Sequence, residues 1–170
     1  TGMNSSTQGI GKMGTTMNVD SGKFFAKLYE NTSDAYVIYE DGVIIDCNQS
    51  AVEMLRADTK DEIIGLRPEA LSPEHQPDGQ LSSEKADELI SEGLKQRKLQ
   101  FEWVHKKLDG EEFWVEVVMT FFDLDGKDYM VTAWRDIADR IEAEETIRQQ
   151  TEAMMDMSTP VIKLWDEIVL

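Results

Sequence analysis

The sequence is poor in cysteine, histidine and basic residues, and it contains no long hydrophobic run. Its single cysteine, Cys47, cannot form an internal disulfide, so we expect a cytoplasmic protein without a disulfide framework. His75 and His105 are the only histidines, and a structural zinc site usually takes about four cysteine or histidine ligands. No apolar run approaches the roughly 18 residues of a membrane-spanning helix, and no signal-peptide pattern occurs, so we expect no membrane partner.

Acidic residues outnumber basic ones, with 34 aspartates and glutamates against 17 lysines and arginines and a net charge of −17. A surface this negative opposes any approach to phosphates, so we expect no nucleic-acid partner. The sequence shows no nucleophile beside a base, no phosphate-binding loop and no metal-ligand cluster. We therefore predict that the chain is not an enzyme, and we predict no cofactor.

The first half of the sequence indicates a tail, a helix and a β-hairpin. Residues 1–21 are rich in glycine, serine, threonine and asparagine, which predicts a disordered tail. The apolar residues of "KFFAKLYENTSDA" then share one helical face. In "AYVIYEDGVIIDCN", Asp41-Gly42 separates two β-branched and aromatic runs, a strong hairpin signal because glycine tolerates the positive φ of tight turns.

The remaining elements complete an α+β pattern. "NQSAVEMLRADTKDEIIG" is typical of helix, with Asn48 as its N-cap, and "SSEKADELISEGLKQRK" has apolar residues at helical spacing. Three strands follow, "LQFEWVHKKL", "EFWVEVVMTFF" and "DYMVTAWRD", joined by Asp109-Gly110 and Asp125-Gly126. This order predicts a five-stranded antiparallel sheet with short helices on one face.

The C-terminal segment predicts a long linker helix. Residues 137–158 contain neither glycine nor proline, so the helix suits parallel dimerisation or packing on its own sheet. Its apolar arc comprises Ile137, Ile141, Ile147 and Met154. After Pro160 the run "VIKLWDEIVL" is strand-like and still apolar at its last residue, which we interpret as the truncated start of a further domain at 159–170.

The layout resembles the PAS sensory domain over residues 24–140. The motifs that carry this resemblance are "GVIIDCNQSAVEML", "HKKLDGEEFWVEV" across the central hairpin, and "AWRDIADRIEAEE" at the exit of the last strand. The resemblance implies a PAS domain at 22–136, whose helices and sheet enclose a small cavity. Such domains sense ligands, redox state, light or gas, or only dimerise, so a homodimer is expected.

The tail "MSTPVIKLWDEIVL" resembles the start of a STAS domain in stressosome scaffold proteins of the RsbR type. This resemblance implies that the linker helix relays a conformational change to a STAS output, with stressosome STAS proteins and a serine/threonine kinase as partners. Thr146 or Thr151 would then be a candidate phosphorylation site in the linker. The alternatives are the PAS module of a histidine kinase or cyclic-dinucleotide enzyme, a haem-based gas sensor, and a pure interaction module.

His75 is the candidate haem ligand, because haem-binding PAS domains take an axial histidine from the helical side near this region. Imidazole ligates iron only when a free nitrogen points into a closed apolar pocket. Here the histidine stands in "SPEHQPDG", between two prolines and before an Asp-Gly turn signal. We therefore expect a solvent-exposed loop residue and keep haem ligation as the alternative.

The inner face of the sheet is expected to carry a cavity or a solid core. Its predicted lining residues are Phe101, Trp103, Val115, Val117, Met119, Val131 and Ala133, with Met54, Leu55 and Leu71 opposite. His105 alternates with Trp103 and shares its face, as a satisfied or solvent-reaching residue rather than a ligand. Cys47 lacks the downstream motif of flavin-binding light sensors, so we expect a half-buried packing thiol.

The exit of the last strand is the expected relay to the output. In the PAS family the aspartate at this point, Asp136 here, helps to fix the angle of the output helix, with Arg135 or a backbone amide as its partner. The predicted relay residues are Arg135, Asp136, Ile137, Ile141, Ile147 and Met154.

Overall fold

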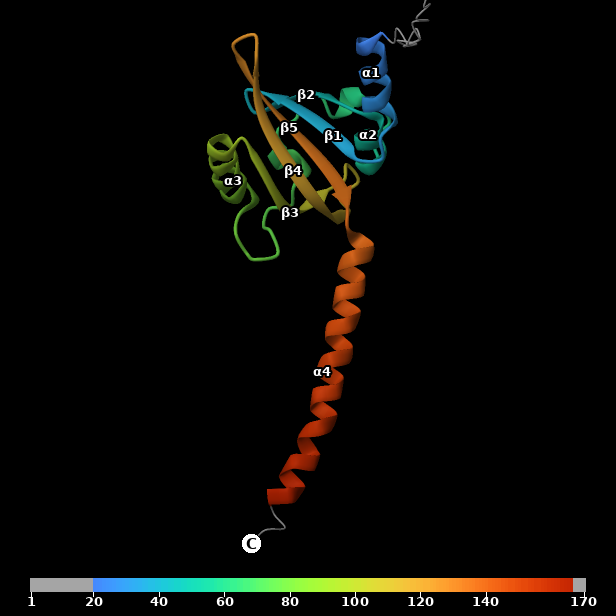
Figure 1. Cartoon of the computed structure of the whole chain (residues 1–170), viewed down its shortest axis with the longest axis vertical. Helices are drawn as coiled ribbons and strands as arrows, with labels where there is room; N and C mark the ends of the chain where they lie inside the picture. Colours follow the sequence, from blue (N-terminus) through green and yellow to red (C-terminus); the bar gives the residue numbers. More distant parts are fainter. Residues whose placement is uncertain (1–19, 167–170) are drawn as a thin grey trace, which may run out of the picture.

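The structure is a computed structural model that describes residues 20–166, with side chains described for residues 20–157. A twisted sheet carries the helical segments, and one long helix leaves it (Figure 1). In chain order the elements are α1 (Ser21–Asn31), β1 (Ala35–Glu40), β2 (Val43–Cys47), α2 (Gln49–Met54), η1 (Lys60–Glu62), η2 (Pro68–Leu71), α3 (Ser82–Gln96), β3 (Lys98–Lys106), β4 (Glu112–Leu124), β5 (Lys127–Asp136) and α4 (Ala138–Asp166).

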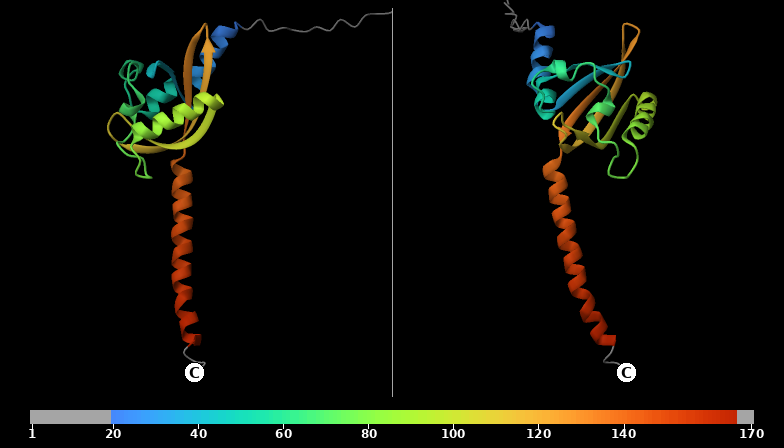
Figure 2. Two further views of the ribbon diagram at one scale, coloured as in Figure 1. Left: turned by 90° about the vertical axis from the view of Figure 1, so that its left-hand side faces the viewer. Right: turned by 180° about the vertical axis from the view of Figure 1, so that it is seen from behind.

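The five strands form one antiparallel sheet in the order β2-β1-β5-β4-β3. The short helices between β2 and β3 pack against this sheet, and α3 lies across β3 and β4 (Figure 2). The predicted α+β class, with a five-stranded antiparallel sheet and a C-terminal helix, is confirmed.

Of the three Asp-Gly turns that join neighbouring strands, two have both residues at positive φ. Asp41 and Gly42 have φ of 51° and 74°, and Asp125 and Gly126 have 54° and 78°. Positive φ at both central positions gives a turn whose twist matches that of the flanking strands. The hairpin predictions at these two sites are therefore correct in position and in cause.

Asn48 ties the N-terminal elements together from a fully buried position. Its Oδ1 accepts hydrogen bonds from Tyr36 N at 2.9 Å and Ala51 N at 3.1 Å, and its Nδ2 donates to Tyr29 O at 2.9 Å and Asp34 O at 3.0 Å. One side chain thus caps α2, as predicted, and also fixes the end of α1 and the start of β1.

The orientation of β5 differs from the prediction by one residue. Met130, Thr132 and Trp134 are buried on the inner face, whereas Val131 and Ala133 are only partly buried on the outer face. Side chains alternate along a strand, so a slip of one residue moves the whole set to the other face. The prediction for Val131 and Ala133 is wrong because Trp134 and Met130 bury more apolar surface than these two do, at the cost of also burying a threonine.

Both ends of the described chain differ from the prediction. Asp20 caps α1 by accepting from Lys23 N at 3.2 Å, and α1 begins at Ser21, so the prediction of a disordered tail to residue 21 is wrong for Ser21; residues 1–19 lie outside the described residues. At the other end α4 continues through Pro160 to Asp166, so the strand predicted after Pro160 is helical as far as it is described. Residues 167–170 lie outside the described part.

Candidate functional site

A pocket of about 40 Å³ lies between the inner face of the sheet and α3. One water needs roughly 10–15 Å³ measured in the same way, so the space holds only a few non-hydrogen atoms. The pocket is lined by Tyr39, Pro68, Ser72, Ala86, Leu89, Ile90, Phe101, Trp103, His105, Val117, Met119, Met130, Thr132 and Trp134.

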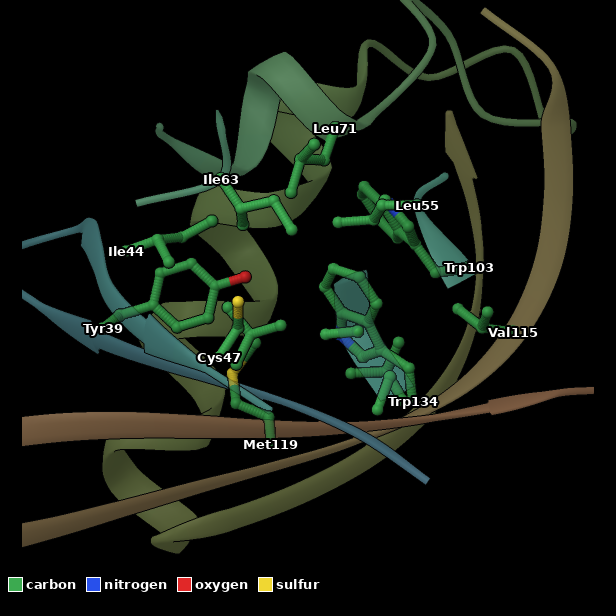
Figure 3. Close-up of a cluster of buried hydrophobic side chains, with 14 of the residues drawn as sticks. Tyr39, Ile44, Cys47, Leu55, Ile63, Leu71, Trp103, Val115, Met119 and Trp134 are labelled. Atoms are coloured by element: carbon green, nitrogen blue, oxygen red, sulfur yellow. The ribbon is translucent and has the colours of Figure 1, made fainter. Parts of the chain in front are cut away.

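Trp103 and Trp134 supply much of the apolar wall of the pocket. Both are almost fully buried, at 4% and 1% exposure, within the main hydrophobic cluster (Figure 3). The indole Nε1 of Trp103 donates to Ser72 Oγ at 3.1 Å, and Ser72 Oγ donates to Pro68 O at 3.1 Å. The one polar group of Trp103 is therefore committed to the loop after η2, which fixes the ring.

His105 is buried and neutral. Its Nδ1 lies 2.8 Å from Leu71 O, and because a carbonyl only accepts, Nδ1 carries the proton. The ring centroid is 4.0 Å from that of Trp134. Burial lowers the pKa of His105 to about 4, and the hydrogen bond to Leu71 offsets only part of that effect. Of the two readings that the sequence left open, the structure shows a satisfied histidine inside the core.

Besides Ser72, whose hydroxyl is already hydrogen-bonded, two residues with hydroxyl groups line the mainly apolar pocket, Tyr39 and Thr132. Thr132 is 4% exposed, and its Oγ1 is buried without a hydrogen bond of standard geometry. The Tyr39 hydroxyl points toward the middle of the cluster (Figure 3) and lies near enough to Thr132 to have its pKa lowered by it, against a larger rise from burial. A buried hydroxyl without a partner is uncommon and needs an explanation.

The pocket departs in part from the predicted lining. It includes Phe101, Trp103, Val117 and Met119. Val115 is fully buried in the core but does not line the pocket. Leu55 and Leu71 are likewise core residues, and Met54 packs at the edge of the core. Thr132 is not among the predicted lining residues, because a threonine between Val131 and Ala133 has the pattern of a solvent-facing position.

His75 does not meet the requirements of a haem ligand. Its side chain is 51% exposed, it lies 3.9 Å from Glu74 through Nδ1, and it does not line the pocket. A pocket of about 40 Å³ is also far below the roughly 300–1,000 Å³ of sites that enclose large ligands. Haem held by His75 therefore does not fit this arrangement of residues.

The neighbour of His75, Gln76, has a structural role that the sequence did not reveal. Its Oε1 accepts from Val104 N at 2.9 Å, and its Nε2 donates to Val104 O at 3.1 Å and to Ser82 Oγ at 2.9 Å. The buried amide of Gln76 thus pairs with the edge of β3 as a further strand would. The loop "SPEHQPDG" is consequently anchored to the sheet, while His75 itself faces outward.

Cys47 is fully buried, which is deeper than the half-buried position expected from the sequence. Burial raises the pKa of its thiol to about 11, and Lys60 offsets part of the rise. A thiol in this state is a weak nucleophile at neutral pH.

The exit of β5 is built as a fixed joint to α4. Asp136 Oδ1 accepts from Ala138 N at 2.8 Å, so the backbone amide, rather than Arg135, is the partner of Asp136. Arg135 instead pairs with Asp34 at 3.0 Å. Ile137 is buried, and its N lies 3.3 Å from Trp114 O in β4.

One turn further along α4, an ion pair reaches back to the sheet. Arg140 Nη2 lies 2.7 Å from Glu102 Oε1 in β3. Glu102 stands between Phe101 and Trp103, which face the pocket from the other side of the same strand. Beyond this point α4 runs free of the sheet, and Ile147 and Met154 are 63% and 71% exposed (Figure 1).

Among the side chains described, those of residues 20–157, no group of three or more histidine, cysteine, aspartate or glutamate residues could hold a metal ion. None of the described helices is long and apolar enough to cross a membrane.

Comparison with known proteins identifies the family of this domain. The PAS domain family model matches residues 33–139. The chain is 30% identical over 152 residues to the oxygen sensor protein DosP of Escherichia coli (strain K12), a match that covers 86% of this chain and 18% of DosP. The chain thus corresponds to a small part of that relative.

Two solved structures show the same fold. The PAS domain of a protein from Colwellia psychrerythraea matches with 25% identity and a TM-score of 0.61, over 71% of this chain and 99% of that one. An RNA-binding light-oxygen-voltage receptor matches with 13% identity and a TM-score of 0.64, over 87% of this chain and 42% of the other.

Proposed function

Since the chain belongs to the PAS domain family, we propose that it is the sensory and dimerisation module of a cytoplasmic signalling protein, in which α4 relays the state of the pocket to an output domain. The observation that carries the proposal is the construction of β3. Phe101 and Trp103 contact the pocket, while Glu102 between them holds Arg140 of α4 at 2.7 Å. A shift of the pocket wall therefore moves the anchor of the helix.

The relay needs only a small displacement. The start of α4 is held by the Asp136 cap, by buried Ile137 and by the Arg140–Glu102 pair. Since α4 extends over 29 residues at about 1.5 Å per residue, a small rotation at its base becomes a displacement of several ångströms at its far end. A ligand shifts such an equilibrium by the difference between its affinities for the two states.

Dimerisation through α4 is supported by its exposed apolar residues. Ile147 and Met154 are seven residues apart, which places them on one side of the helix, and Met157 follows at 72% exposure. A second copy of α4 in parallel would cover this side. Arg148 and Glu152 between them are charged, so this side of the helix is not a continuous apolar seam.

The identity of the output is proposed from sequence alone. The resemblance of "MSTPVIKLWDEIVL" to the start of a STAS domain favours a stressosome scaffold with STAS partners and a serine/threonine kinase. An output of the histidine-kinase or cyclic-dinucleotide class is the second candidate, and DosP, an oxygen sensor by name, keeps gas sensing among the stimuli to be tested.

Cross-linking tests the relay. Ile147→Cys in the full chain is expected to form an interchain disulfide, and buried Cys47 does not compete. Arg140→Gln should change the cross-linking rate, whereas Arg148→Gln, which removes a pair with Glu145 within the helix, should not. The double variant Arg140→Glu with Glu102→Arg, which exchanges the two charges, should restore the cross-linking rate of the protein that carries Ile147→Cys alone. Equal rates in all variants would contradict the proposal.

A further inference from the structure

The pocket beside Thr132 has the character of a site for one class of molecule. From its chemistry we infer that it takes a small, neutral, mainly apolar ligand with one hydroxyl or carbonyl oxygen, and that Thr132 selects this oxygen. This inference rests on the proposed sensory function, because it names the ligand class of the same pocket.

The size of the pocket limits the ligand to a few non-hydrogen atoms. Its volume of about 40 Å³ is about three times what one water requires. Met119 and Met130 line it, and their unbranched side chains adapt to a changed shape. A ligand of three to five non-hydrogen atoms fits, and the ceiling on affinity per atom means that its dissociation constant is no tighter than about 0.5 mM for three atoms and about 3 μM for five.

The charge of the pocket limits the ligand to neutral molecules. None of the described residues that line it is an aspartate, glutamate, lysine or arginine, and His105 is neutral. Lys85 lies outside, with its Nζ 5.8 Å from the centroid of the Trp103 ring, and it pairs with Asp78 at 2.6 Å. A carboxylate in this space would lose its hydration without gaining a cation, which is strongly unfavourable.

The hydrogen-bonding state of the polar groups that line the pocket favours a ligand with one oxygen atom. The indole N–H of Trp103 is already used on Ser72, and Nδ1 of His105 is used on Leu71. The hydroxyls of Thr132 and Tyr39 remain. Thr132 is 4% exposed and its Oγ1 makes no hydrogen bond of standard geometry, although it lies near enough to the Tyr39 hydroxyl to lower the pKa of that group. A hydroxyl can donate as well as accept, so it satisfies either an alcohol or a carbonyl compound.

The test titrates the full chain with three probes: n-propanol, propionate and xenon. Binding is monitored by NMR through the indole N–H signals of Trp103 and Trp134. Wild-type protein should bind n-propanol and not propionate, which has the same length but a negative charge. Thr132→Val keeps the shape and removes the hydroxyl. It should weaken n-propanol binding by about three- to tenfold, the range expected for one hydrogen bond, and leave xenon binding equal or stronger.

Thr120→Val is the matched control, because Thr120 lies on the outer face of β4 and does not line the pocket. It should change no affinity. Thr132→Val should change the urea midpoint little, because Thr132 Oγ1 makes no hydrogen bond of standard geometry within the protein. Failure of n-propanol to bind, equal binding of propionate, or equal n-propanol affinity in Thr132→Val would each overturn the inference.

The two proposals fail in different ways. If n-propanol binds through Thr132 but leaves the Ile147→Cys cross-linking rate unchanged, the ligand class stands and the relay fails. If n-propanol does not bind but Arg140→Gln still changes the cross-linking, the relay stands and the ligand class is wrong.

Discussion

Replacement of Asn48 by alanine should be among the most destabilising single changes in the domain. The side chain is fully buried and makes four hydrogen bonds, all to backbone groups of three different elements or their flanking loops. Alanine removes both the donors and the acceptor. It leaves Tyr29 O, Asp34 O and two backbone N–H groups without these partners, at positions that are buried or partly buried.

The magnitude follows from those bonds. A hydrogen bond contributes about 1 kcal/mol net to stability, and a buried group left unpaired costs at least as much. Four bonds therefore predict a loss of about 3–4 kcal/mol, a large share of the roughly 5–15 kcal/mol that stabilises a typical domain. The loss should also loosen α1, because Asn48 Nδ2 binds Tyr29 O near the end of that helix.

Urea unfolding followed by circular dichroism measures this loss. The matched control is Asn31→Ala, because Asn31 is exposed and its single described hydrogen bond, to Lys27 O, stays within α1. The control should lose less than about 1 kcal/mol. A loss below about 1 kcal/mol for Asn48→Ala itself would refute the reasoning that this residue joins the three elements.

Two further predictions concern the pocket and its cover. Burial lowers the pKa of His105 from 6.5 to about 4, so the unfolded chain binds the proton more readily than the folded one. The free energy of unfolding should therefore fall by up to about 3 kcal/mol as the pH decreases from about 6.5 to about 4. His105→Gln should remove this part of the pH dependence in urea titrations. A His105→Gln variant with an unchanged pH dependence would contradict it. Gly93→Ala should destabilise by about 1–3 kcal/mol, since its Cβ would lie 2.6 Å from Phe121 Cε2, whereas Gly22→Ala, whose Cβ would come no closer than 3.5 Å to Asp20 Oδ1, should not destabilise. Equal melting temperatures for the two glycine variants would show that α3 moves freely away from β4.

The sequence predicted those parts of the fold that depend on local signals. Asp41-Gly42 fixed a hairpin because its conformation needs those residue types, and Asn48 was recognised as a cap from the helical pattern that follows it. The long-range role of Asn48 could not be predicted, because Tyr29 and Asp34 approach it only through the tertiary fold.

The pocket was harder to predict than the sheet. The alternation of side chains along β3 correctly predicted that Phe101 and Trp103 face the pocket. In β5 it predicted the wrong face, so that Val131 rather than Thr132 was expected on the inner side. Which face of β5 is buried depends on the apolar surface that Trp134 and Met130 bury together. Gln76 gave no signal at all, since an amide that pairs with a strand edge looks in the sequence like any polar loop residue. The strand predicted after Pro160 failed because an apolar run of this length suits either a strand or a helix.

The central claim is that the pocket and α4 are mechanically linked, and a pocket-filling variant tests it most directly. Ala86 lines the pocket from α3, so Ala86→Leu adds the bulk of a small ligand there, while Asp87→Leu places the same leucine side chain on the exposed side in exchange for a carboxylate. Spin labels on Ile147→Cys would report the distance between the two α4 helices of a dimer. We predict that Ala86→Leu shifts this distance distribution and Asp87→Leu leaves it unchanged. Identical distributions in both variants and the parent would contradict the account.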